Sequence, residues 1–88
     1  MGTDYVGQTS FSIYGSVKVI ESDHIIVALD DFANIKLYLD DEELSETTIS
    51  KLELDKSYNF QGHFNHNHEK NIFSLHVYEI YDEEGVEL

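Results

Sequence analysis

Residues 11–19 read FSIYGSVKV, and their alternation of apolar and polar side chains predicts a half-buried β-strand. Phe11, Ile13, Val17 and Val19 form the apolar side, which we expect to face inward. Gly15 stands in the middle of the strand, where a glycine is typical of a bulge or a sharp bend. Closing a small sheet into a barrel requires such bends. The stretch therefore predicts an all-β protein with a curved first strand.

The same alternation continues along the chain and predicts four more strands. We expect them at residues 25–29, 35–39, 57–64 and 72–81, separated by polar turns. Residues 65–71, rich in asparagine and histidine, are expected to form the turn of the last hairpin. The side chains expected to face inward on the last two strands are Tyr58, Phe60, Phe64, Phe73, Leu75 and Val77.

Residues 40–55 lack the alternation and separate the third expected strand from the fourth. The segment opens with four consecutive carboxylates, which could begin a short helix because acidic residues stabilise helix N-termini. Thr47 and Thr48 are poor helix formers, so we expect one or two helical turns at most. The predicted order is three strands, a short helix and a hairpin of two strands.

This order resembles that of the OB-fold (oligonucleotide/oligosaccharide-binding) superfamily, a small five-stranded Greek-key barrel. Gly15 and Val17 in the first strand are similar to the curved opening strand of the family. The sequence LELDKSYNFQG at residues 52–62 resembles the family's approach to its fourth strand, where Gly62 permits coiling. The likeness covers residues 10–81 of one domain spanning residues 1–88, and residues 82–88 are expected to form a mobile acidic tail.

Acidity is the most unusual property of the chain. Eighteen acidic residues and five lysines, with no arginine, give a formal net charge of −13. A field of this sign repels phosphate backbones and acidic membranes and attracts basic partners. The six tyrosines, five phenylalanines and 41% hydrophobic content argue against disorder. A protein partner that is basic, or a larger nucleoprotein complex, is therefore expected.

Several protein classes are disfavoured by what the sequence lacks. There is no cysteine for a disulfide or a thiolate zinc site, and no apolar run approaches the roughly 18 residues of a membrane span. The N-terminus has neither the basic end nor the apolar stretch of a signal peptide. No phosphate-binding loop, nucleophile elbow or zinc-protease motif is present. We expect a cytoplasmic, non-enzymatic protein without a cofactor.

The outward side of the first three strands is the first candidate site, because OB-folds bind ligands there. Single-strand binders combine aromatic rings, on which bases stack, with positive charge. Tyrosine and lysine also decorate ordinary exposed strands, and the missing arginine counts against tight binding. The candidate nucleic-acid-binding residues are Tyr14, Lys18, Lys36 and Tyr38, with His76 and Tyr78 on the last strand.

Two further clusters suggest other ligands. The acids expected to meet a basic partner protein are Asp40, Asp41, Glu42 and Glu43, together with Asp82, Glu83 and Glu84 in the tail. His63, His66 and His68 have a spacing that can hold zinc, nickel or copper. A polar turn at the tip of a hairpin explains the same histidines without a metal.

Three functions remain open at the level of the sequence. The favoured one is an acidic protein-interaction subunit in nucleic-acid metabolism, as in the small OB modules of replication-protein-A-like assemblies that the chain resembles. The second is a direct but weak binder of single-stranded DNA or RNA through the tyrosines and lysines. The third is an acidic mimic of nucleic acid that inhibits a basic protein. The pattern does not dictate an oligomeric state.

Overall fold

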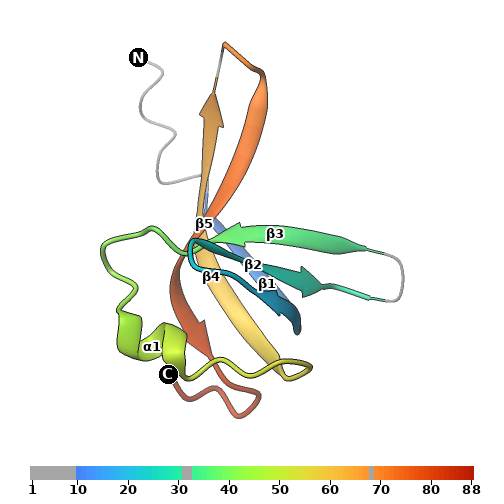
Figure 1. Ribbon diagram of the computed structural model, residues 1–88, viewed down its shortest axis with the longest axis vertical. Helices are drawn as coiled ribbons and strands as arrows, with labels where there is room; N and C mark the ends of the chain where they lie inside the picture. Colours follow the sequence, from blue (N-terminus) through green and yellow to red (C-terminus); the bar gives the residue numbers. More distant parts are fainter. Residues whose placement is uncertain (1–9, 31–32, 68) are drawn as a thin grey trace.

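The computed structural model describes residues 10–30, 33–67 and 69–88, and most of them lie in β-strands (Figure 1). The order of three strands, one short helix and two strands agrees with the prediction. The elements are β1 (Ser10–Ile20), β2 (His24–Ala28), β3 (Asn34–Tyr38), α1 (Glu46–Ser50), β4 (Ser57–Asn67) and β5 (Ile72–Tyr81). The helical residues that the structure describes are too few to cross a membrane.

The five strands form one sheet that closes into a ring in the order β1-β2-β3-β5-β4. The long strand β1 closes the ring, because its first half pairs with β4 and its second half pairs with β2. Neighbouring strands are antiparallel except β3 and β5, which run parallel and meet in one pair, Tyr38 opposite His76. The all-β class predicted from the alternation is confirmed.

The irregularity of β1 lies after Gly15, not at it. The pairing of β1 with β2 shifts between Val17 and Val19, so Val19 lies opposite Ile26. The expectation that Val19 faces inward is wrong, since its side chain is 38% exposed. Gly15 has a different role: a Cβ atom there would lie 2.5 Å from the carbonyl oxygen of Ala28. Glycine therefore lets β1 approach β2 closely.

A second shift, in β5, changes which of its side chains face the core. Gln61 lies opposite Glu79 but Gly62 lies opposite Val77, so Tyr78 is the extra residue. The inward series therefore passes from Val77 to Ile80, and both are fully buried. Alternation continued along the chain without a bulge would have placed Ile80 on the outward side.

The β4–β5 hairpin projects beyond the closed ring, as the orange strands of Figure 1 show. We call residues 64–67 and 72–75 the hairpin arm. The fourth strand was expected to end at residue 64, but it continues to Asn67, so His66 lies in a strand and not in the turn. Because the arm leaves the ring, Phe73 is 62% exposed and the expectation that it packs inward is wrong. Leu75, nearer the ring, packs against the core.

The core lies inside the ring and is closed at one end by residues around α1. Tyr58 and Phe60 of β4 are its largest fully buried side chains. The hydroxyl oxygen of Tyr58 accepts a hydrogen bond from the backbone N–H of Glu53 at 3.0 Å, so its polar end is satisfied. The buried set comprises Val17, Ile25, Val27, Leu37, Leu39, Leu44, Leu52, Tyr58, Phe60, Val77 and Ile80.

The helix begins later than the acids suggested. Ser45 caps α1, and its side-chain oxygen accepts a hydrogen bond from the N–H of Thr48 at 3.1 Å. Asp41 instead folds its own segment into a turn, in which its carboxylate accepts a hydrogen bond from the N–H of Glu43 at 2.8 Å. Aspartate competes with helix formation through such local bonds, so residues 40–43 form a loop ahead of the helix.

The C-terminal segment folds back onto the ring, unlike the mobile tail expected from its composition. The N–H of Leu88 donates to the carbonyl oxygen of Ile80 at 3.0 Å, and its own carbonyl oxygen accepts from Thr48 Oγ1 at 3.1 Å. The carboxylate of Asp82 accepts hydrogen bonds from the N–H groups of Glu84 and Val86. The apolar side chain of Leu88 packs against the core.

Candidate functional site

Part of the predicted ligand-binding face forms a row of stacked rings across β3, β5 and β4. The rings of Tyr38 and His76 stack with centroids 5.3 Å apart, because the two residues form the only pair that joins β3 to β5 in the described chain. His63 stacks on His76 at 5.5 Å and on Tyr78 at 6.2 Å. The Nζ of Lys36 lies 4.8 Å from the centroid of the Tyr38 ring.

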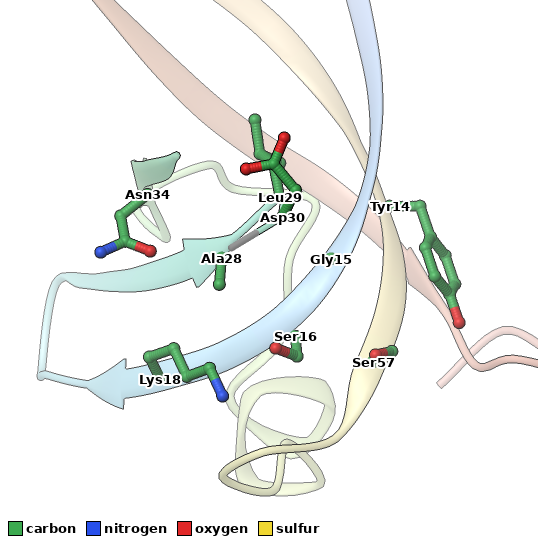
Figure 2. Close-up of a pocket in the computed structure, with 9 residues that line it drawn as sticks. All are labelled: Tyr14, Gly15, Ser16, Lys18, Ala28, Leu29, Asp30, Asn34 and Ser57. Atoms are coloured by element: carbon green, nitrogen blue, oxygen red, sulfur yellow. The ribbon is translucent and has the colours of Figure 1, made fainter. Parts of the chain in front are cut away.

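Tyr14 and Lys18 do not belong to this row. Both belong to β1, and Figure 2 shows them among the residues that line a different pocket. This pocket is open and has a volume of about 550 Å³. Lys18 Nζ lies 2.9 Å from a carboxylate oxygen of Asp55, and the Tyr14 hydroxyl points at Glu83 at 3.4 Å. The structure therefore brings together four of the six predicted residues and adds His63, which the spacing had suggested as a metal ligand.

The ring faces in the row are largely used by one another. His76 has Tyr38 on one side and His63 on the other, and its side chain is only 13% exposed. Lys36 covers part of Tyr38. A nucleic-acid base needs an exposed ring face on which to stack. Because these ring faces already contact one another or Lys36, the row is disfavoured as a platform on which bases stack.

The acidic loop (Asp40, Asp41, Glu42 and Glu43) lies against the two histidines in the middle of this row. His76 Nδ1 is 2.6 Å from Asp40 Oδ1, and His63 Nδ1 is 3.6 Å from Asp41 Oδ2. His76 Nε2 is in turn 2.8 Å from the hydroxyl of Ser74, so the imidazole is held at both nitrogens. The loop and the two histidines border the acidic pocket, an open hollow of about 380 Å³. Its lining residues are Asp40, Asp41, Glu42, Glu43, His63, Asn65 and His76.

The acidic pocket can attract and hold a cation of side-chain size. Its four carboxylates come from consecutive residues, so their charges are held within one short loop. The side chain of Asp41 is only 16% exposed, and partial burial strengthens its interaction with any charge that enters. Asn65 is the lining residue that sequence reasoning missed, because its position was assigned to a turn.

The predicted histidine metal site is not assembled in the part of the chain that the structure describes. His63 and His66 lie three positions apart on β4 and therefore on opposite faces of the strand. His66 stacks on Phe73 at 4.4 Å and lies 3.1 Å from the side-chain oxygen of Asn71. His68 lies outside the described residues. Within the described ranges, no three histidine or carboxylate side chains are grouped to hold a metal ion.

The tail acids form a separate group. Asp82, Glu83 and Glu84 line a smaller hollow of about 200 Å³ with Lys56. The carboxylate of Asp82 is occupied by its own turn, as described above, and Glu83 accepts from Tyr14. The two acidic groups that the sequence suggested as one partner-binding patch therefore line different hollows, and the tail group includes a lysine.

Among the residues that the structure describes, two titratable groups have a perturbed pKa, and neither lines the acidic pocket. A hydrogen bond with the His24 ring at 2.7 Å holds the pKa of Asp23 below its ordinary value of 3.8. The Tyr81 hydroxyl donates to the Glu79 carboxylate at 3.0 Å, which raises the pKa of Tyr81 above its ordinary value of 10.0. Both pairs are local contacts between residues one or two positions apart in the sequence.

No known protein-family model matches this chain, and no curated protein matches it either. The function is therefore inferred from the arrangement of its own residues. The arrangement most clearly suited to binding is the acidic pocket, which is lined by four carboxylates and by two imidazoles that contact them.

Proposed function

We propose that this chain is an OB-fold binding module without enzymatic activity, and that it binds a basic segment of a partner protein in the acidic pocket. The ring order of the strands and the helix between β3 and β4 support the likeness to the OB-fold. A role as an accessory subunit in nucleic-acid metabolism follows from that likeness. The partner would then be a basic protein of the same assembly.

The observation that carries the proposal is the contact of the acidic loop with His63 and His76. Asp40 is anchored to His76, so the loop is held against the sheet while Asp41, Glu42 and Glu43 line the same hollow. A lysine or arginine side chain entering the hollow would form charge-assisted hydrogen bonds, which are about twice as strong as neutral ones. The lysines of this chain do not line it.

The distribution of positive charge supports a protein partner over nucleic acid. Lys18 is already paired with Asp55 at 2.9 Å, and Lys56 with Glu53 at 3.6 Å. The net charge of −13 repels phosphates but steers a basic protein toward the surface. Both effects weaken as salt rises, since exposed charges are screened over about 8 Å at physiological ionic strength.

The test is a titration of the protein with a fluorescein-labelled lysine- and arginine-rich peptide at low and physiological salt. The Asp41→Asn and Glu42→Gln variants should each weaken binding by up to about fivefold, the value of one partly exposed ion pair. Glu87→Gln is the matched control, because it removes the same charge from an exposed residue outside the pocket. Equal weakening in all three variants would mean that only net charge matters and would contradict the proposed site.

A second candidate function, direct binding of single-stranded DNA or RNA, is favoured by one observation. Lys36 lies over Tyr38 within the ring row, which is the pairing of cation and aromatic ring that such proteins use. Tyr38→Ala should then lower affinity by about 1–3 kcal/mol for each base stacked on it. Fluorescence polarisation with labelled single strands measures this, and absence of binding at low salt would eliminate the candidate.

A further inference from the structure

The hairpin arm has a strand edge that is open along most of its length. On one side, the arm residues of β5 pair with β4, from Phe64 opposite Leu75 to Asn67 opposite Ile72. On the other side, β3 reaches β5 only at His76. Among the residues that the structure describes, no strand pairs with that side of residues 72–75. Backbone N–H and C=O groups on such an edge are free to pair with another chain.

The β5 side of the arm is also apolar where it is exposed. Ile72 and Phe73 are 55% and 62% exposed, and Phe73 lies edge-on to Phe64 at 6.5 Å. Natural proteins usually protect an open edge with a lysine, a proline or a bulge. Residues 72–75 read IFSL and contain neither lysine nor proline, and the bulge of β5 lies further along, at Tyr78. This edge therefore has the properties of a pairing site.

The two faces of the arm differ in character, which defines what would fit beside it. Phe73 and Leu75 share one face with the core, whereas Ser74 and His76 share the other with the acidic pocket. The open edge begins beside His76, which is bonded to Asp40. A strand laid along the edge would have alternate side chains facing Phe73 and Leu75, and the intervening ones facing the acidic loop.

We propose that the partner segment binds as an added β-strand along residues 72–75, with apolar side chains on the core side and basic side chains on the side of the acidic pocket. This inference rests on the proposed function and names the form of the partner: an extended segment in which apolar and basic residues alternate. A second copy of this chain does not fit, because it adds a charge of −13 and its own β5 contains no lysine or arginine.

The test uses two synthetic peptides of identical composition and the full-length protein. In one peptide lysine and valine alternate, and in the other all the lysines precede all the valines. Both carry the same charge, but only the alternating peptide can present two different faces as a strand. We expect it to bind at least about tenfold more tightly, since it gains several main-chain hydrogen bonds.

Main-chain pairing is tested by N-methylation of alternate amides in the alternating peptide. Along a bound edge strand, every second N–H points at the protein, and the others point away. Methylating one set should abolish binding, whereas methylating the other set should leave it nearly unchanged. An equal effect of the two sets would overturn strand pairing.

Phe73→Thr tests the apolar side of the site, because threonine keeps the preference for a strand while removing the ring. We expect about tenfold weaker binding of the alternating peptide. Leu54→Thr is the matched control, an exposed apolar residue that precedes β4 and lies outside the arm. Circular dichroism of both variants establishes that the fold is intact, and equal affinity for both would count against the arm.

The outcomes separate this inference from the proposed function. If both peptides bind equally and Asp41→Asn weakens both, strand addition is overturned while the basic partner stands. If neither peptide binds at low salt, both proposals fail. If sedimentation shows a dimer that Phe73→Thr dissociates, the edge belongs to a second copy and the inference is wrong.

Discussion

Replacing Gly62 with alanine tests whether the closure of the ring depends on the close approach of β4 to β5. A Cβ atom at this position would overlap the carbonyl oxygen of His76 and lie 2.7 Å from Cζ of Phe11. Phe11 can move its ring, but the carbonyl belongs to the backbone of β5 and to the pair that joins β5 to β3. The strand must therefore shift by a substantial fraction of an ångström or more.

The magnitude follows from what that shift disrupts. Overpacking a tight site costs about 1–3 kcal/mol, and each ladder hydrogen bond lost on either side adds a net cost of about 1 kcal/mol. We expect Gly62→Ala to lower the free energy of unfolding by about 3–5 kcal/mol, a large share of the roughly 5–15 kcal/mol that a domain possesses. For a domain of this size the melting temperature would fall by at least about 12 °C.

Urea unfolding followed by circular dichroism measures the loss, and Gly85→Ala is its control. Gly85 has a φ of +84° and nothing within 4 Å of the added Cβ, so its substitution carries backbone strain without a clash. That strain costs about 1–2 kcal/mol. If Gly62→Ala is no more destabilising than Gly85→Ala, the argument from close approach is wrong.

Tyr58→Phe should lower the free energy of unfolding by about 1 kcal/mol, because the N–H of Glu53 loses its acceptor; the urea midpoint checks this. Leu88→Ala should cost about 1–2 kcal/mol in the same assay, because its side chain packs on the core, whereas a mobile tail predicts no change. The pKa of Asp23 is lowered by His24, so its contribution to stability is present above its ordinary pKa of 3.8 and is lost as pH falls through the lower folded value. Unfolding of Asp23→Asn should therefore depend less on pH below about pH 4 than that of wild type, and an identical acid profile would contradict the assignment.

Much of the fold could be predicted because a strand is indicated by the alternation of apolar and polar residues over a short stretch of sequence. Side chains two positions apart share a face of a strand, so the pattern at residues 11–19 located β1 and placed Val17 inside. The same reasoning placed Leu37, Phe60 and Val77 in the core, and all three are fully buried. These features depend on neighbours in the sequence and on which residues avoid water.

The errors in the strands have a different origin, since they depend on which strands meet. A bulge shifts the inward series by one residue, and its position is set by the partner strand. Val19 and Phe73 were therefore assigned to the wrong environment, one after a bulge and the other on an arm that leaves the ring. The start of α1 was placed too early for a local reason. Asp41 accepts a hydrogen bond within its own turn, and the helix begins after Ser45, a residue type that favours the N-cap position.

In the candidate site, too, some features follow from the sequence and others only from the tertiary structure. Composition alone determined that the protein is strongly acidic, and the sequence marked residues 40–43 as a concentration of that charge. Only the tertiary structure placed this loop against His63 and His76, because a parallel pair joins strands that are separated by the helix and β4. Whether a lysine is available to a ligand was likewise decided in three dimensions, where Lys18 meets Asp55 across 37 residues of sequence. Local patterns specify faces and charge, but long-range strand pairing decides which of those faces and charges become neighbours.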